Sequence, residues 1–386
     1  MTFFSDILSH YQWSGLALVL LLTILFFVQL YYYAIVYNRI YRYRLMRRRK
    51  LRCEQPPVSV IVALRGENES FLSIELPSLL AQHYHTFEVV VIYIGSDIDY
   101  FRELQRLRDN HAHMRLTKLS GGSESIYIST KQAMNIGIKS AQYDNLLFTV
   151  PGATPRSEEW VSYMAKGFER GEVVAAPAVP HFEDDNIKSY LMRMVEFNHQ
   201  RTAFASAVNG RFYYAPRSNY GFTRSMYEAT RGYNHLNIDI GDNDLYLQAF
   251  ATPQRTAVVL TPHSVVTEER NGAWGEWTEL MRYYNSTSAY YPAWARRGKS
   301  RELGSRTLFF LCAIATMVLL PHELRIFAAL LVVVRYIIAV WSSRRTARKL
   351  GERNIAPRYW IYDLIGPMIE YMIGRGKSHS NPKLWR

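Results

Sequence analysis

Cysteine is nearly absent from this chain, which has only Cys53 and Cys312 among its 386 residues. Cys53 follows a basic stretch beside an apolar segment, and Cys312 lies within a second apolar segment. Two thiols placed in this way cannot form a disulfide framework or a cysteine-based metal cluster.

Acidic residues are missing from 39–52, a stretch that holds eight lysines and arginines. The preceding residues 13–37 are almost wholly apolar and aromatic, and at ~1.5 Å per residue they can cross a ~30 Å hydrocarbon core. This run is too long for a signal-peptide core and ends without a small-residue cleavage site. We expect an N-terminal tail over 1–12, a transmembrane helix over 13–37 and a basic juxtamembrane segment over 38–54.

Positive charge beside a span marks the cytoplasmic side of the membrane. The body that follows should therefore lie in the cytoplasm, in a protein integral to the inner (cell) membrane. The net charge of +13 does not require a nucleic-acid partner, because much of the excess lies in 39–52 and 344–349. Membrane lipids with anionic headgroups are the better partners for these stretches.

The C-terminal region predicts further membrane segments. Residues 306–342 contain two apolar runs separated by a polar break at 322–325, which is typical of a transmembrane hairpin. Residues 343–386 should form a cytoplasmic tail. Within that tail, 360–373 is apolar but carries acidic residues and a proline, which indicates an interfacial or re-entrant segment.

Arg335 interrupts the second run of the hairpin. We expect its side chain to snorkel toward the membrane surface or to pair with Glu323. The alternative is contact with a lipid-phosphate substrate.

Between the membrane segments, residues 55–300 form a body of single-domain size. Its apolar runs alternate between strand-like and helix-like spacing. The expected strands are 58–64, 87–94, 114–119 and one starting at 146, and the expected helices are 70–82, 100–110, 129–141 and 189–205. This order predicts the α/β class, with a mostly parallel, doubly wound sheet.

Ionisable groups are absent from 146–155, which reads Leu-Leu-Phe-Thr-Val-Pro-Gly-Ala-Thr-Pro. In open α/β sheets the ligand lies just outside the carboxyl ends of the strands. A strand that ends in an uncharged loop therefore limits the chemistry available at that edge.

Several motifs follow one another in an order that resembles a known family. They are 58–63, Lys131-Gln132-Ala133 with Gly137-Ile138-Lys139, 146–149, Gly241-Asp242-Asn243-Asp244-Leu245, and Trp277 with Arg282. Together with the layout of span, body and hairpin, they resemble the membrane-attached family 2 glycosyltransferases over about residues 57–287. The resemblance implies a GT-A fold, which is Rossmann-like with a mostly parallel sheet, here flanked by transmembrane helices. It also implies inverting transfer of a sugar from a nucleotide sugar to a lipid-linked or envelope glycan acceptor.

Inverting transfer requires a base for the acceptor hydroxyl and positive charge for the departing diphosphate. The resemblance places the base at Asp242, with Asp244 as the second candidate, although either aspartate would also cap a helix starting near Leu245. The donor-binding candidates are Arg65, Glu67, Lys131, Arg156 and Arg282, and the acceptor-binding candidates are Asn219 and Trp277. For Lys131 and Arg156 the alternative is an ordinary solvated charge.

Three elements depart from the family pattern. Residues 150–152 read Val-Pro-Gly, where the family places an Asp-x-Asp that holds a divalent metal. Ile94 stands where the family has an aspartate that binds the base, and the Gln-x-x-Arg-Trp-like element reads Glu-Leu-Met-Arg-Tyr over 279–283. We therefore expect no metal site, and we expect Lys131 and Arg282 to hold the diphosphate of the nucleotide sugar by charge alone.

Two functions compete on these grounds. The first is an active, membrane-bound glycosyltransferase that works without the usual metal. The second is a catalytically inactive pseudo-glycosyltransferase that serves a partner protein as scaffold or regulatory subunit. A processive polysaccharide synthase fits less well, because the chain has few spans and its terminal motif is degraded.

Overall fold

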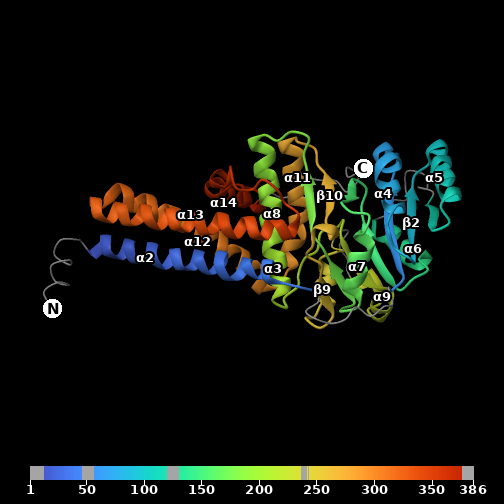
Figure 1. Ribbon diagram of the computed structural model, residues 1–386, viewed down its shortest axis with the longest axis horizontal. Helices are drawn as coiled ribbons and strands as arrows, with labels where there is room; N and C mark the ends of the chain where they lie inside the picture. Colours follow the sequence, from blue (N-terminus) through green and yellow to red (C-terminus); the bar gives the residue numbers. More distant parts are fainter. Residues whose placement is uncertain (1–12, 46–55, 120–129, 236–240, 242, 376–386) are drawn as a thin grey trace.

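The computed structural model describes residues 13–45, 56–119, 130–235, 241 and 243–375. The expected tail over 1–12, most of the basic juxtamembrane segment, Asp242 and the last residues of the chain lie outside this described part. Figure 1 shows two regions, a bundle of long helices and an α/β body at one end of it.

The main sheet of the body has seven strands in the order β3-β2-β1-β4-β8-β6-β9. Their bounds are β1 Val58–Arg65, β2 Phe87–Ile94, β3 Met114–Leu119, β4 Asn145–Thr149, β6 Val173–Ala175, β8 Tyr220–Thr223 and β9 Thr256–Val258. Strands β1 to β4 are mutually parallel and β6 is parallel to β9, whereas β8 is antiparallel to both of its neighbours. The predicted mostly parallel α/β sheet is confirmed, and the continuous apolar runs of β1 and β2 are buried on both faces.

A smaller sheet extends the body from the carboxyl edge of the main sheet. Its order is β5-β10-β7, with β5 Ala153–Pro155, β7 Ala178–His181 and β10 Val266–Glu269. The helices of the body are η2 Phe71–Glu75, α4 Leu76–Leu80, α5 Ile98–Asn110, α6 Thr130–Ser140, α7 Trp160–Phe168, α8 Ile187–Val208, α9 Arg224–Ala229, η3 Gly232–His235, α10 Leu245–Phe250, η4 Pro262–Ser264, α11 Trp274–Asn285 and η5 Ser286–Tyr290.

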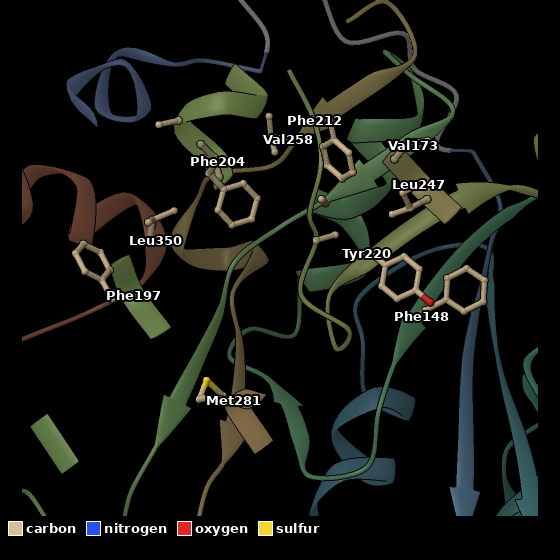
Figure 2. Packing of buried hydrophobic residues seen from close by; sticks show 14 of the residues in the cluster. Phe148, Val173, Phe197, Phe204, Phe212, Tyr220, Leu247, Val258, Met281 and Leu350 are labelled. Carbon is tan, nitrogen blue, oxygen red and sulfur yellow. The ribbon is translucent and has the colours of Figure 1, made fainter. Parts of the chain in front are cut away.

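The hydrophobic core covers both faces of the main sheet. On one face Phe148 of β4 stacks on Tyr220 of β8, with ring centroids 4.9 Å apart (Figure 2). Helix α6 lies close to β1 and β2 because Gly137 has no side chain, and a Cβ there would come within 2.6 Å of Ile61. Since α6 connects parallel strands β3 and β4, its first turn lies at the carboxyl edge of the sheet.

Among the described residues, three helices are long and apolar enough to cross a membrane. They are residues Trp13–Arg42, α12 Ala293–Leu319 and α13 His322–Leu350. The first is one continuous helix made of α2 Trp13–Leu30, the π-helical η1 Tyr31–Tyr37 and α3 Asn38–Arg42. All three exceed the expected bounds, because each continues into contact with the body, and Figure 1 shows α2, α12 and α13 side by side.

Arg335 of α13 pairs with a different acid from the one expected. Its guanidinium donates to both carboxylate oxygens of Asp363, with Nη2 3.0 Å from Oδ1, and Nη2 also donates to Gln29 Oε1 at 2.8 Å. All three side chains are buried, whereas Glu323 is exposed at the start of α13. The expectation of pairing with Glu323 is wrong because α14 (Tyr359–Arg375) packs against the bundle and brings Asp363 to Arg335.

Candidate active site

The carboxyl edge of the main sheet has a switch point between β1 and β4, since β1 pairs with β2 on one side and with β4 on the other. Ligands of open α/β sheets bind outside such a point. Strand β1 ends there at Arg65, Glu67 is exposed in the following turn, and Lys131 lies in the first turn of α6. The structure therefore brings three of the predicted donor-binding residues to one edge.

The uncharged loop after β4 is held by a carboxylate from another helix. The Gly152 amide donates to Glu75 Oε2 at 2.8 Å, and the Gly152 carbonyl accepts from the Glu269 amide at 2.8 Å. Gly152 has a φ of 83°, which glycine adopts without strain. Glu75 is 2% exposed, and burial raises the pKa of its carboxyl while the hydrogen bond from Gly152 opposes the rise.

The side chains that the structure describes at this edge do not fit a divalent metal ion. Val150, Pro151 and Gly152 offer no side-chain ligand, and Glu75 already accepts an amide hydrogen bond. Hard divalent cations take about six or more oxygen ligands. In the part of the chain that the structure describes, no group of three or more His, Cys, Asp or Glu side chains is arranged to hold one.

A cavity opens where the body meets the membrane helices. Its walls come from α8, β10, α11, the start of α12 and α14, with the start of α10 at one end. Its ionisable lining consists of Glu196, His199, Arg217, Asp244, Glu268, Arg270, Lys299 and Glu370, and its tyrosines are Tyr214, Tyr283 and Tyr284. Carboxylates accept hydrogen bonds from hydroxyls, and aromatic faces stack on sugar rings, so this lining suits a polar, hydroxyl-rich ligand.

Asp244 lies at the end of this cavity and is 4% exposed. Its Oδ1 accepts from the Leu245 amide at 2.7 Å, which makes it the N-cap of α10. Its Oδ2 accepts from Thr287 and Tyr291, each at 2.5 Å. The capping role weighed for this aspartate is thus present, and both oxygens have donors, whereas Asp242 lies outside the described residues.

Two carboxylates flank one arginine on the opposite wall. Arg270 Nη2 contacts Glu268 directly and lies 3.6 Å from Glu196 Oε2. Trp277 Nε1 donates to Glu196 Oε1 at 2.8 Å, so Trp277 orients a lining residue without lining the cavity itself. Burial raises the pKa of Glu196 while Arg270 opposes the rise.

The third wall carries a neutral histidine. The His199 Nδ1 lies 3.5 Å from Lys299 Nζ, and Lys299 in turn lies 3.8 Å from Glu370 Oε2. Burial, with a smaller contribution from the charge of Lys299, lowers the pKa of His199 to about 3. His199 is therefore uncharged at neutral pH and offers the cavity a polar ring.

The remaining predicted residues lie elsewhere. Arg156 donates to Thr267 Oγ1 at 2.7 Å and to the Gly351 carbonyl at 2.6 Å, on a different side of the small sheet. Arg282 pairs with Glu279 at 2.7 Å on the surface of α11. Asn219 is fully buried, donates to the carbonyls of Pro177 and Ser264, both at 2.7 Å, and accepts from Trp160 Nε1 at 3.0 Å.

Sequence reasoning missed Glu75, Glu196 and the Glu268–Arg270 pair. Glu75 has a signal, since it is the one charged residue in the apolar run 71–80. Glu196 has a weaker sequence signal, which is its position as an acidic residue on a long helix. Glu268 and Arg270 become neighbours of Glu196 only through the fold.

Comparisons with known proteins support the fold. No protein-family model matches the chain, and no curated protein matches its sequence. Among solved structures, it is similar to the mannosyltransferase PcManGT from Pyrobaculum calidifontis in complex with GDP-Man and Mn²⁺, with 14% identity, a TM-score of 0.54, and coverage of 93% of this chain and 100% of that chain. A crystal structure of S. aureus TarS 1–349 matches at 12% identity and a TM-score of 0.39, covering 82% of this chain and 88% of that one. The first likeness shows that the chain has the fold of a glycosyltransferase, as the α/β architecture indicates.

Proposed function

We propose that this protein is a membrane-bound glycosyltransferase that moves a sugar, with inversion, from a nucleotide sugar to a lipid-linked or envelope glycan. The observation that carries the proposal is the cavity of carboxylates and tyrosines between the body and the membrane helices. Its lining residues Glu268 and Arg270 flank Glu269, whose amide bonds the loop after β4. Donor and acceptor would then meet at one end of the sheet.

The reaction proposed is a single in-line displacement. The acceptor hydroxyl oxygen bonds to the anomeric carbon, the bond from that carbon to the diphosphate oxygen breaks, and a carboxylate takes the hydroxyl proton. Asp242 is the proposed base and Asp244 the second candidate, although the cap and the two hydroxyl donors commit much of the acceptor capacity of Asp244. The departing diphosphate would be stabilised by Lys131 and Arg65.

In this proposal, positively charged side chains stabilise the leaving diphosphate in place of a metal ion. The Pyrobaculum calidifontis enzyme was solved with Mn²⁺, but the loop of this chain offers no side-chain ligand. Removing a preorganised charge-stabilising group costs about 3–4 kcal/mol, a deficit of the size that one or two well-placed cations can offset. Arg282 forms an ion pair with Glu279 on α11.

The experiment is transfer by the full-length protein in nanodiscs, using radiolabelled UDP- and GDP-sugars and a total lipid extract from its host. We expect one donor to label the lipid fraction and Asp242→Asn to abolish labelling. The matched control is Asp109→Asn, an exposed aspartate on α5, which should leave labelling unchanged. Labelling that persists in both Asp242→Asn and Asp244→Asn would refute the proposed base.

The pseudo-glycosyltransferase remains the second candidate because of one contact. The Glu75 carboxylate reaches the loop where a diphosphate would bind, and a buried acid there opposes an anionic donor. Calorimetric titration of UDP and GDP into the full-length protein separates the two functions. Absence of nucleotide binding, together with absence of transfer, would favour the scaffold, whose partner protein should then co-purify with both wild type and Asp242→Asn.

The membrane placement is part of the proposal. The three spans, the basic residues beside the first span and those at the end of α13 support an inner-membrane protein with its body in the cytoplasm. The domain division proposed is a first span, a GT-A-like body over about 55–300, a hairpin and a tail. Protease protection of the body in inside-out against right-side-out vesicles tests this orientation.

A further inference from the structure

A second cavity lies between the small sheet and the cytoplasmic end of α13. It has a volume of about 830 Å³. One wall is the edge of β7 with Arg193 of α8, and the other is the end of α13 with the turn that follows it. It shares no lining residue with the cavity that holds Asp244, so the first site does not account for it.

The charge of this cavity is strongly positive. Four arginines line it, namely Arg156, Arg193, Arg348 and Arg353. The one carboxylate among the lining residues is Glu352. Outside the lining, Asp185 lies 3.7 Å from Arg193 and 3.3 Å from Arg358, so it is shared between two cations. The excess of positive charge at the cavity surface therefore favours binding of an anion.

The polar atoms at its base are incompletely satisfied. Arg193 Nε lies 3.7 Å from Glu352 Oε2, beyond hydrogen-bond distance. Within the described residues, neither Arg193 Nε nor Glu352 Oε1 has a hydrogen-bond partner, although both are buried. Buried polar atoms normally have partners, and a bound group with both acceptors and a donor, or one with ordered water, would supply them.

Burial also weakens the one opposing charge. The pKa of Glu352 is raised to about 7 by burial, against the lowering effects of Arg193 and Arg156. At neutral pH a large fraction of Glu352 is therefore protonated, and the arginines are correspondingly less balanced.

The cavity wall is built before any ligand arrives. Arg156 Nε donates to Thr267 and its Nη1 to the Gly351 carbonyl, which fixes the guanidinium across the gap between body and membrane helix. Gly351 ends α13 in the left-handed region with a φ of 81°, and a Cβ there would lie 2.7 Å from Val265. A preorganised guanidinium loses less entropy on binding than a free one.

We propose that this cavity binds a phosphate-bearing anion, a phosphate or pyrophosphate group held by the lining arginines Arg156, Arg193, Arg348 and Arg353. Guanidinium groups match the oxygens of phosphate in paired hydrogen bonds. The group belongs either to a soluble nucleotide or to an anionic lipid headgroup, since Arg344 and Arg345 continue the basic surface along α13 beside Trp341. Because the wall joins the body to α13, occupancy would stabilise that junction.

The test uses the full-length protein in neutral detergent and inorganic pyrophosphate as probe, with binding measured by calorimetry. The variant is R348Q/R353Q, at two exposed positions, and the charge-matched control is R102Q/R106Q on the exposed face of α5. Each arginine should contribute about tenfold to the affinity, so we expect ~100-fold weaker binding in R348Q/R353Q and unchanged binding in the control.

A second arm distinguishes the two sources of the phosphate. The unfolding midpoint is measured in nanodiscs of phosphatidylcholine alone and with phosphatidylglycerol. A lipid source predicts that phosphatidylglycerol raises the midpoint of wild type but not that of R348Q/R353Q. Pyrophosphate binding without this lipid effect identifies a soluble source. The proposal is overturned if neither probe acts, if R348Q/R353Q behaves as wild type, or if pyrophosphate binding is lost only in Lys131→Gln, which would place it at the sheet edge.

Discussion

Breaking the buried pair between Arg335 of α13 and Asp363 of α14 should strongly destabilise the folded protein. Asp363 is 2% exposed and Arg335 1% exposed, and the guanidinium contacts both carboxylate oxygens. Asp363→Asn keeps one acceptor oxygen but removes the negative charge, so the buried Arg335 guanidinium is left with neutral partners at position 363 and at Gln29. It also removes an acid 3.9 Å from the fully buried Arg306.

The expected loss is about 3–5 kcal/mol, the cost of removing one partner of a buried ion pair. That is a large share of the ~5–15 kcal/mol by which a folded domain is stable. Replacing both partners by apolar residues of similar volume is often nearly neutral. The double variant R335M/D363L should therefore lose less stability than Asp363→Asn or Arg335→Met alone.

The assay is equilibrium unfolding in mixed micelles, followed by circular dichroism, for the two single variants and the double variant. The control is Arg344→Gln, an exposed arginine on the same helix, with an expected change within about 0.5 kcal/mol. The reasoning is refuted if each single variant costs less than ~1 kcal/mol and the double variant equals their sum, because a coupled pair cannot be additive.

Three further predictions follow from the body. The pKa of His199 is about 3 in the folded protein and ~6.5 in the unfolded chain. The unfolded chain therefore binds a proton that the folded protein does not, and the free energy of unfolding should fall as pH drops from about 6.5 toward 3. His199→Gln should reduce this pH dependence, measured as unfolding midpoints between pH 7 and 5. Glu75→Ala leaves the Gly152 amide without its acceptor and should cost about 1–3 kcal/mol, whereas Glu75→Gln keeps an oxygen and should cost less; equal midpoints would contradict this. Titration of UDP and GDP in EDTA and in Mn²⁺ should give the same affinity, and a metal-dependent gain would contradict the proposed use of protein cations.

The strands were predictable where burial dictates residue type. Residues 87–94 are a strand with the expected bounds, because a parallel strand covered on both faces is apolar almost throughout. Residues 114–119 are also a strand with the expected bounds, although this strand lies at the edge of the sheet, is mostly half-buried and carries Arg115 and Lys118. Helix α6 begins and ends within one residue of expectation, since its small and apolar residues share one face.

The contacts of the site were not predictable in the same way. The bond from Gly152 to Glu75 joins positions 77 residues apart, and that from Arg335 to Asp363 joins positions 28 apart. Neither follows from local spacing, because each depends on how one helix packs against another. Arg156 illustrates the same point, since it closely follows the uncharged loop after β4 in the chain but donates to the Gly351 carbonyl, 195 residues away.

The unbroken course of α12 determines how high above the bilayer the first cavity lies. The helix runs without interruption from Ala293 in the body to Leu319, and Lys299 in its second turn lines the cavity. From Lys299 to Leu319 the rise is about 30 Å at ~1.5 Å per residue, which equals the thickness of the hydrocarbon core. Under the membrane placement proposed above, the cavity would open near the level of the lipid headgroups, where a glycan joined to its lipid by a short link could enter and one carried far from the surface could not.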